Sequence, residues 1–115
     1  MPFLFATRVP NGYPTVTDGH RVDLMDLSGH YARWEEDFEL VRSLGVSALR
    51  YGPAYYRTHI GPDHFDWEVV EEQMQVLERS GLTVIAELCR FGVPGWLGGF
   101  QDPAFPVLFA EYARA

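Results

Sequence analysis

The hydrophobic positions of this chain follow two patterns, one typical of strands and one typical of helices, which alternate along the sequence. Three short apolar runs bounded by turn residues lie at 3–7, 46–51 and 83–88. Such runs predict β-strands, and the third is apolar enough to predict a strand that is buried on both faces of a parallel sheet. Because ligands of parallel α/β folds bind beyond the C-terminal ends of the strands, we expect a site after Leu88.

Between and after these strands, apolar residues recur at helical spacing. Residues 31–44, 66–79 and 103–115 each carry an apolar stripe beside a polar face, which predicts amphipathic helices. Asp66 at the start of the second helix and Asp102 just before the third are the expected N-caps. The segments left over, above all the long polar stretches before the first two of these helices, are expected to be loops.

The alternation of strand and helix predicts an α/β fold with a parallel sheet and external helices. We interpret residues 1–115 as one domain region, the N-terminal three βα units of an incomplete (β/α)8 TIM barrel, which needs about 250 residues when complete. Half of a doubly wound sheet is the alternative, although no glycine-rich phosphate loop follows the first strand. The last helix has no C-cap residue, so we expect the chain to be cut within it at Ala115.

Composition and charge narrow the range of partners. The formal net charge of −7 argues against nucleic acid as a partner. No stretch has the length of a membrane span or the form of a signal peptide, so we expect a cytoplasmic protein without membrane contact. The single cysteine, Cys89, forms no disulfide within the chain. His59 and His64 lack metal-ligand spacing, and we expect neither a metal nor any other cofactor.

Side chains suited to binding lie at the expected strand ends. Arg90, Phe91 and Trp96 follow the third strand and are candidates for a binding mouth. Aromatic residues make up 15% of the chain, and rings in loops suit the apolar faces of sugars, although packing of loops on helices explains them equally well. Asn11 follows the first strand, where a barrel places site residues, but an ordinary Asn-Gly turn is the simpler interpretation.

Arg50 ends the second strand and needs an anionic partner if it is buried. Glu87, on the neighbouring strand, is the structural candidate for that partner. A catalytic carboxylate is the functional candidate.

Three segments of the sequence resemble family 1 glycoside hydrolases, the β-glucosidase group. FLFAT at 3–7 is similar to the opening strand of that family. RWEEDFELVRSLGVSALRYGPAYYR at 33–57 is similar to its R-x-x-E-D-x-x-L-x-x-x-L-G-x-x-x-x-R-F-S-I-x-W-x-R stretch, and GLTVIAELCRFGVPGWLGGFQDPAFPVLFAEYAR at 81–114 to the region that contains its H-W-D-L-P motif. The order and spacing of the three segments agree, and together they cover a divergent N-terminal portion of the family.

The resemblance implies roles for individual residues. Arg50 matches the arginine that contacts the nucleophilic glutamate, which makes it a supporting group and not the acid or base itself. Tyr55 matches an aromatic residue at the mouth, Phe91 a tryptophan, and Arg90 a histidine that hydrogen-bonds the sugar. The change from histidine to arginine adds charge and would suit an acidic or otherwise modified sugar.

The function implied is hydrolysis of O-glycosidic bonds with retention, on a carbohydrate substrate. Retaining enzymes need two carboxylates about 5–5.5 Å apart. The family holds them after its fourth and seventh strands, so both are expected beyond residue 115, and the 115 residues alone are expected to be inactive. A non-catalytic carbohydrate-binding or interaction barrel, or one domain of a larger sugar-modifying enzyme, are the alternatives.

Overall fold

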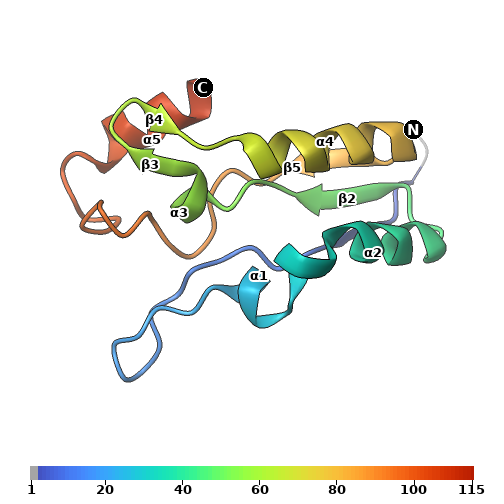
Figure 1. Cartoon of the computed structure of the whole chain (residues 1–115), viewed down its shortest axis with the longest axis horizontal. Coiled ribbons are helices and arrows are strands. Elements are labelled where there is room, and N and C mark those ends of the chain that lie inside the picture. Colours follow the sequence, from blue (N-terminus) through green and yellow to red (C-terminus); the bar gives the residue numbers. More distant parts are fainter. Residues whose placement is uncertain (1–2) are drawn as a thin grey trace.

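The computed structural model describes residues 3–115 and is built around one small parallel sheet (Figure 1). Its strands are β1 (Ala6–Arg8), β2 (Ala48–Tyr51) and β5 (Thr83–Ala86), in the order β1-β2-β5. Both pairings are parallel, and Arg8, Arg50 and Ile85 lie side by side in register. The parallel sheet predicted from the apolar runs is therefore confirmed, with strands shorter than those runs.

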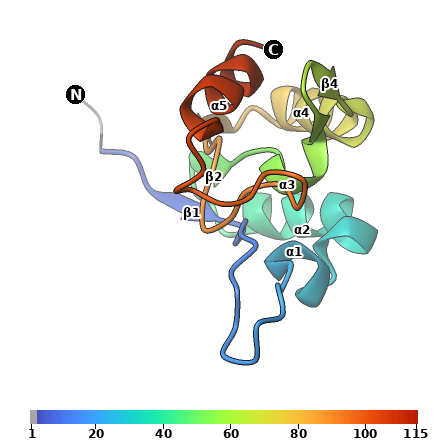
Figure 2. The ribbon, with the colours of Figure 1, turned by 90° about the vertical axis from the view of Figure 1, so that its left-hand side faces the viewer.

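Two helices cover one face of this sheet (Figure 2). They are α2 (His30–Ser43) and α4 (Glu68–Ser80), close to the predicted bounds. Leu49 and Tyr51 of β2 point toward them because side chains alternate along a strand. The core on this side consists of Met25, Phe38, Val41, Leu49, Tyr51, Ala54 and Leu77. Each large side chain buried here contributes about 1.5–3 kcal/mol.

The predicted caps lie slightly before the helices that they were expected to begin. Asp66 accepts a hydrogen bond from the backbone of Glu68 at 3.2 Å, but Trp67 is the residue at the N-cap of α4. Asp102 accepts one from the backbone of Ala104 at 2.9 Å, and α5 (Phe105–Arg114) begins after that turn. Both carboxylates therefore close the turns that lead into the helices.

The long segments predicted to be loops contain short regular elements, which corrects that prediction. A helical turn, α1 (Leu24–Leu27), follows Asp23, whose carboxylate accepts hydrogen bonds from two backbone N–H groups. After β2 come the helical turn α3 (Tyr55–Thr58) and the antiparallel strands β3 (His59–Gly61) and β4 (His64–Phe65). Elements of two to four residues are too short to produce a recognisable periodicity.

These short elements gather at the end toward which the strands point (Figure 1). A second core cluster of Tyr55, Val93, Leu97 and Tyr112, with Phe65 packed against it, joins α3 and β4 to α5 and to the loop after β5. The parts that follow each strand therefore meet at one end of the sheet, where a parallel α/β fold places its site.

The second face of the sheet is open. Ile85 of β5 is 47% exposed and Arg50 of β2 has an exposed side chain. The radius of gyration is 15.1 Å, larger than the roughly 13 Å of a compact domain of this length. The prediction that β5 is buried on both faces is wrong for the described residues, because β5 is an edge strand and only the helix side is covered.

Candidate functional site

The ends of β2 and β5 are pressed together at the open face. Glu87, the first residue after β5, donates its backbone N–H to the carbonyl of Tyr51 at 3.1 Å. Gly52 follows Tyr51, and a Cβ at that position would lie 1.8 Å from the Glu87 carbonyl oxygen. Only glycine permits this approach, so Gly52 lets the Glu87 backbone lie here and thereby sets the position of its side chain.

Glu87 forms the centre of a charged cluster. Its side chain is only 4% exposed, and the Arg50 Nε lies 3.3 Å from its Oε2 while the Arg50 Nη2 donates to Oε1 at 3.4 Å. The Nε of Arg90 lies 3.8 Å from Oε1. The side chains of Arg50 and Arg90 are 49% and 24% exposed, so two partly solvated guanidinium groups converge on one buried carboxylate.

One oxygen of this carboxylate remains unsatisfied. Within residues 3–115, Glu87 Oε2 is buried and accepts no hydrogen bond, because Arg50 approaches it without suitable geometry. A buried carboxylate oxygen is costly to leave without a donor. Oε2 has almost no surface open to solvent, so its charge is balanced by the Arg50 guanidinium group 3.3 Å away.

Phe91 extends the site away from the charges. The guanidinium carbon of Arg90 lies 4.8 Å from the centre of the Phe91 ring, which restrains the arginine by a cation–π contact. Phe91 is 58% exposed and has a left-handed backbone with φ of 48°, a conformation that costs a non-glycine residue about 1–3 kcal/mol. Its carbonyl accepts a hydrogen bond from Tyr13 N–H at 2.9 Å, which ties this strained turn to the loop after β1.

A surface groove of about 390 Å³ runs beside the exposed Phe91 ring. Its walls come from the loop after β1 and from the loop after β5, and they include Tyr13, Arg21, Phe91, Val93 and Phe100. The groove therefore combines aromatic surface with nearby positive charge.

The other predicted site residues are placed differently. Asn11 is buried and its amide donates to the carbonyls of Gly52 at 3.2 Å and Pro53 at 2.9 Å, which joins the loop after β1 to the loop after β2. Tyr55 is buried in the second core cluster, where burial raises its pKa to about 12. Trp96 donates its indole N–H to the carbonyl of His59 at 2.7 Å. The structure thus brings together Arg50, Arg90 and Phe91, while the binding roles of these other three residues stay predictions.

Sequence reasoning missed Arg8 and undervalued Glu87. Arg8 ends β1 and is the register partner of Arg50, so both side chains leave the same face of the sheet. The signal was available, because arginine or glutamate stands at or just after the end of each of the three strands. Glu87 was considered only as a structural partner of Arg50, and the structure shows this pair.

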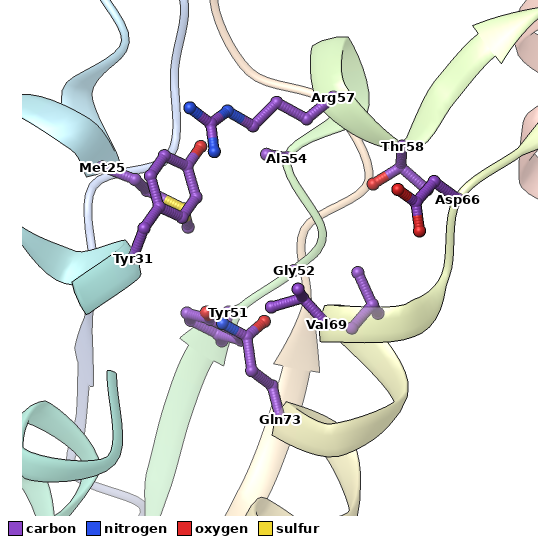
Figure 3. Close-up of a pocket in the computed structure, with 11 residues that line it drawn as sticks. Met25, Tyr31, Tyr51, Gly52, Ala54, Arg57, Thr58, Asp66, Val69 and Gln73 are labelled. Carbon is purple, nitrogen blue, oxygen red and sulfur yellow. The ribbon is translucent and has the colours of Figure 1, made fainter. Parts of the chain in front are cut away.

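A second cavity, of about 180 Å³, lies on the helix side of the strand ends (Figure 3). Tyr51 and Gly52 of the β2 end, Tyr31 of α2 and Gln73 of α4 contribute to its wall. It lies on the face of the sheet opposite to Arg50, so it is separate from the charged cluster.

Other kinds of chemistry have little support in the described part of the chain. Burial raises the pKa of the Cys89 thiol, so it is not an activated thiolate. Among residues 3–115 no group of three or more potential metal ligands comes together. In the same range, no helix combines the length and the apolar character needed to cross a membrane.

Comparison with known proteins agrees with the sequence resemblance but is limited in extent. The chain is 32% identical over 95 residues to a β-glucosidase from Agrobacterium sp. (strain ATCC 21400). The match covers 74% of this chain and 20% of that protein, so the chain spans about a fifth of the length of the relative. No family model and no solved structure matches the chain. These findings indicate a glycoside hydrolase-like region.

Proposed function

We propose that this chain is the N-terminal part of a retaining β-glycosidase, in which β1, β2 and β5 are the first three strands of a (β/α)8 barrel. The all-parallel sheet with helices on one face supports this arrangement. The open face, which carries Arg50 and Ile85, would become the inner face of the barrel once further strands were added. The partial similarity to a β-glucosidase supports the reaction class.

The observation that carries the proposal is the position of Arg50. Its guanidinium group stands at the C-terminal end of a parallel strand, on the open face, and is half exposed although it is paired with Glu87. A guanidinium group has five N–H donors, more than this one carboxylate uses. Arg50 can therefore hold a second carboxylate in place, which is the role of an arginine beside a catalytic nucleophile.

The described residues cannot supply the chemistry by themselves. Retaining hydrolysis needs one carboxylate as nucleophile and another as acid and base, about 5–5.5 Å apart. Within residues 3–115, the strand ends hold only Glu87, and its side chain is engaged with Arg50 and Arg90. In our proposal both catalytic carboxylates lie C-terminal to Ala115, and the present residues bind and orient the sugar.

The test is hydrolysis by the complete product of the gene. We expect it to cleave p-nitrophenyl β-glycosides and to release the β-anomer first, as followed by proton NMR. Arg50→Gln should lower kcat/KM by about 100-fold or more, since loss of one preorganised donor to developing charge has effects of that order. Arg42→Gln is the matched control, because Arg42 is exposed on α2 and pairs with Glu39. An inverted product, or full activity of Arg50→Gln, would contradict the proposal.

A non-catalytic carbohydrate-binding barrel is the second candidate. It is favoured by the ion pair between Arg50 and Glu87, because an arginine that already has a carboxylate partner does not require a nucleophile. This candidate predicts that the complete protein binds β-glycosides without turnover.

A further inference from the structure

We propose that the open end of the sheet selects sugars that carry an anionic group, a carboxylate or a phosphate. This inference rests on the proposed glycoside-binding function and specifies its substrate class. The argument starts from charge. The chain as a whole has a formal charge of −7, yet the strand ends at the open face carry Arg8, Arg50 and Arg90.

The cluster contains more positive than negative charge. Glu87 is the carboxylate with which the described residues pair Arg50 and Arg90. Arg8 is exposed and lies beside Arg50 in register, on the same face. Even with the nucleophile that we propose beside Arg50, two carboxylates would face three guanidinium groups. The remaining positive charge favours an anion at this end of the sheet.

The arginines are also held in position before a ligand arrives. Glu87 is anchored by the close contact of its backbone with Gly52, and it draws Arg50 and Arg90 toward one point. The Phe91 ring, whose centre lies 4.8 Å from the guanidinium carbon of Arg90, restrains Arg90 further. Both guanidinium groups keep solvent-exposed area, so they can form charge-assisted, bidentate hydrogen bonds with a carboxylate or phosphate.

The aromatic surface beside the charges indicates that the anion belongs to a sugar. The exposed ring of Phe91 and the groove beside it offer an apolar surface to the face of a pyranose ring. A simple inorganic anion would use the arginines but not this surface.

The test is isothermal titration calorimetry on the complete gene product at low ionic strength. Methyl β-D-glucuronide is compared with methyl β-D-glucoside, and glucose 6-phosphate with glucose. We expect one anionic ligand to bind about tenfold more tightly than its neutral partner, with a preference that shrinks as salt is added. The pair that shows the preference identifies the anionic group as carboxylate or phosphate.

Two variants and one control test the residues that carry this inference. Arg90→Gln should reduce the preference about fivefold or more, and Arg8→Gln should reduce it less, because Arg8 makes no contact with Glu87 in the described structure. Arg42→Gln, on the surface of α2, should leave it unchanged. If Arg90→Gln does not fold, the exposed Arg8 still allows the test.

The outcomes separate this inference from the proposed function. Equal binding of anionic and neutral ligands would overturn the anionic preference and leave glycoside binding in place. A preference that survives in the folded arginine variants would overturn the role of the cluster. Absence of binding by all four ligands would overturn this inference and glycoside binding together.

Discussion

The two faces of the sheet differ in how completely their groups are satisfied. On the helix face, Leu49 and Tyr51 are fully buried. His30 on that side is paired through both ring nitrogens, since Nε2 lies 2.7 Å from the Tyr51 hydroxyl and Nδ1 lies 2.7 Å from Asp37. On the open face, the Arg50 side chain is 49% exposed, and one carboxylate oxygen of Glu87 has no hydrogen-bond donor among the described residues.

Because of this difference, neighbouring residues of one strand serve different purposes, some stability and others binding. Leu49, Arg50 and Tyr51 are consecutive, but the period of two in a strand sends Arg50 away from the core. Groups that are fully packed and paired contribute to the free energy of unfolding. Groups that stay exposed at the strand ends are available to a ligand.

The largest effect is expected at Gly52, where the ends of β2 and β5 meet. Gly52→Ala places a methyl group 1.8 Å from the Glu87 carbonyl oxygen, a backbone clash that cannot be relieved without moving β5. We expect a loss of about 4 kcal/mol or more in the free energy of unfolding, measured by urea denaturation, together with loss of ligand binding. Gly95→Ala is the control, because its Cβ meets no atom within 4 Å. Equal stability of the two variants would contradict the geometry of the strand ends.

The second effect tests the barrel directly. Leu49→Ala should cost about 2–5 kcal/mol, because Leu49 is fully buried against the helices. Ile85 is 47% exposed in the described residues, so Ile85→Ala should cost less than about 1 kcal/mol if this face stays open. If further strands close a barrel over it, as we propose, Ile85→Ala in the complete protein should cost about as much as Leu49→Ala. A small cost there would contradict the barrel.

A smaller effect compares two buried tyrosines. Tyr51→Phe leaves His30 Nε2 without its partner and should cost about 1–3 kcal/mol in denaturant unfolding. The Tyr55 hydroxyl is buried without a hydrogen-bond partner in residues 3–115, so Tyr55→Phe should be neutral or slightly stabilising. If Tyr55 binds sugar as the resemblance implies, ligand affinity would fall while stability does not. A large loss of stability in Tyr55→Phe would show that its hydroxyl is satisfied.

The smallest effect concerns acid stability away from both faces. The backbone N–H of Asp63, followed by His59, lowers the pKa of Glu111 in the folded chain. A depressed folded pKa contributes stability above the unfolded pKa of about 4.3, and this contribution is lost as pH falls through the folded value. Glu111→Gln should therefore flatten the acid limb of the stability–pH curve, while Glu35→Gln on the polar face of α2 should leave it unchanged. An unaltered acid limb in Glu111→Gln would contradict this assignment.

Periodicity predicted the parallel sheet and its covering helices because their apolar positions repeat over many residues. It could not predict the hairpin at 59–65 or the helical turn at 24–27, because these elements are too short to show a repeat. It placed Arg50, Arg90 and Phe91 correctly at the strand ends. It could not show that the Asn11 amide donates to the carbonyls of Gly52 and Pro53, because these residues are 41 and 42 positions away in the sequence.

The central claim is that the charged cluster at the strand ends of the open face binds a glycoside. Arg50→Gln in the complete protein tests it most directly, with glycoside binding measured by calorimetry and the free energy of unfolding measured on the same sample. We predict that binding by the folded variant weakens about tenfold or more. Stability also falls, by about 1–3 kcal/mol, because the buried Glu87 carboxylate loses its nearer guanidinium partner. Unchanged binding by the folded variant would show that Arg50 is only structural and would contradict the claim.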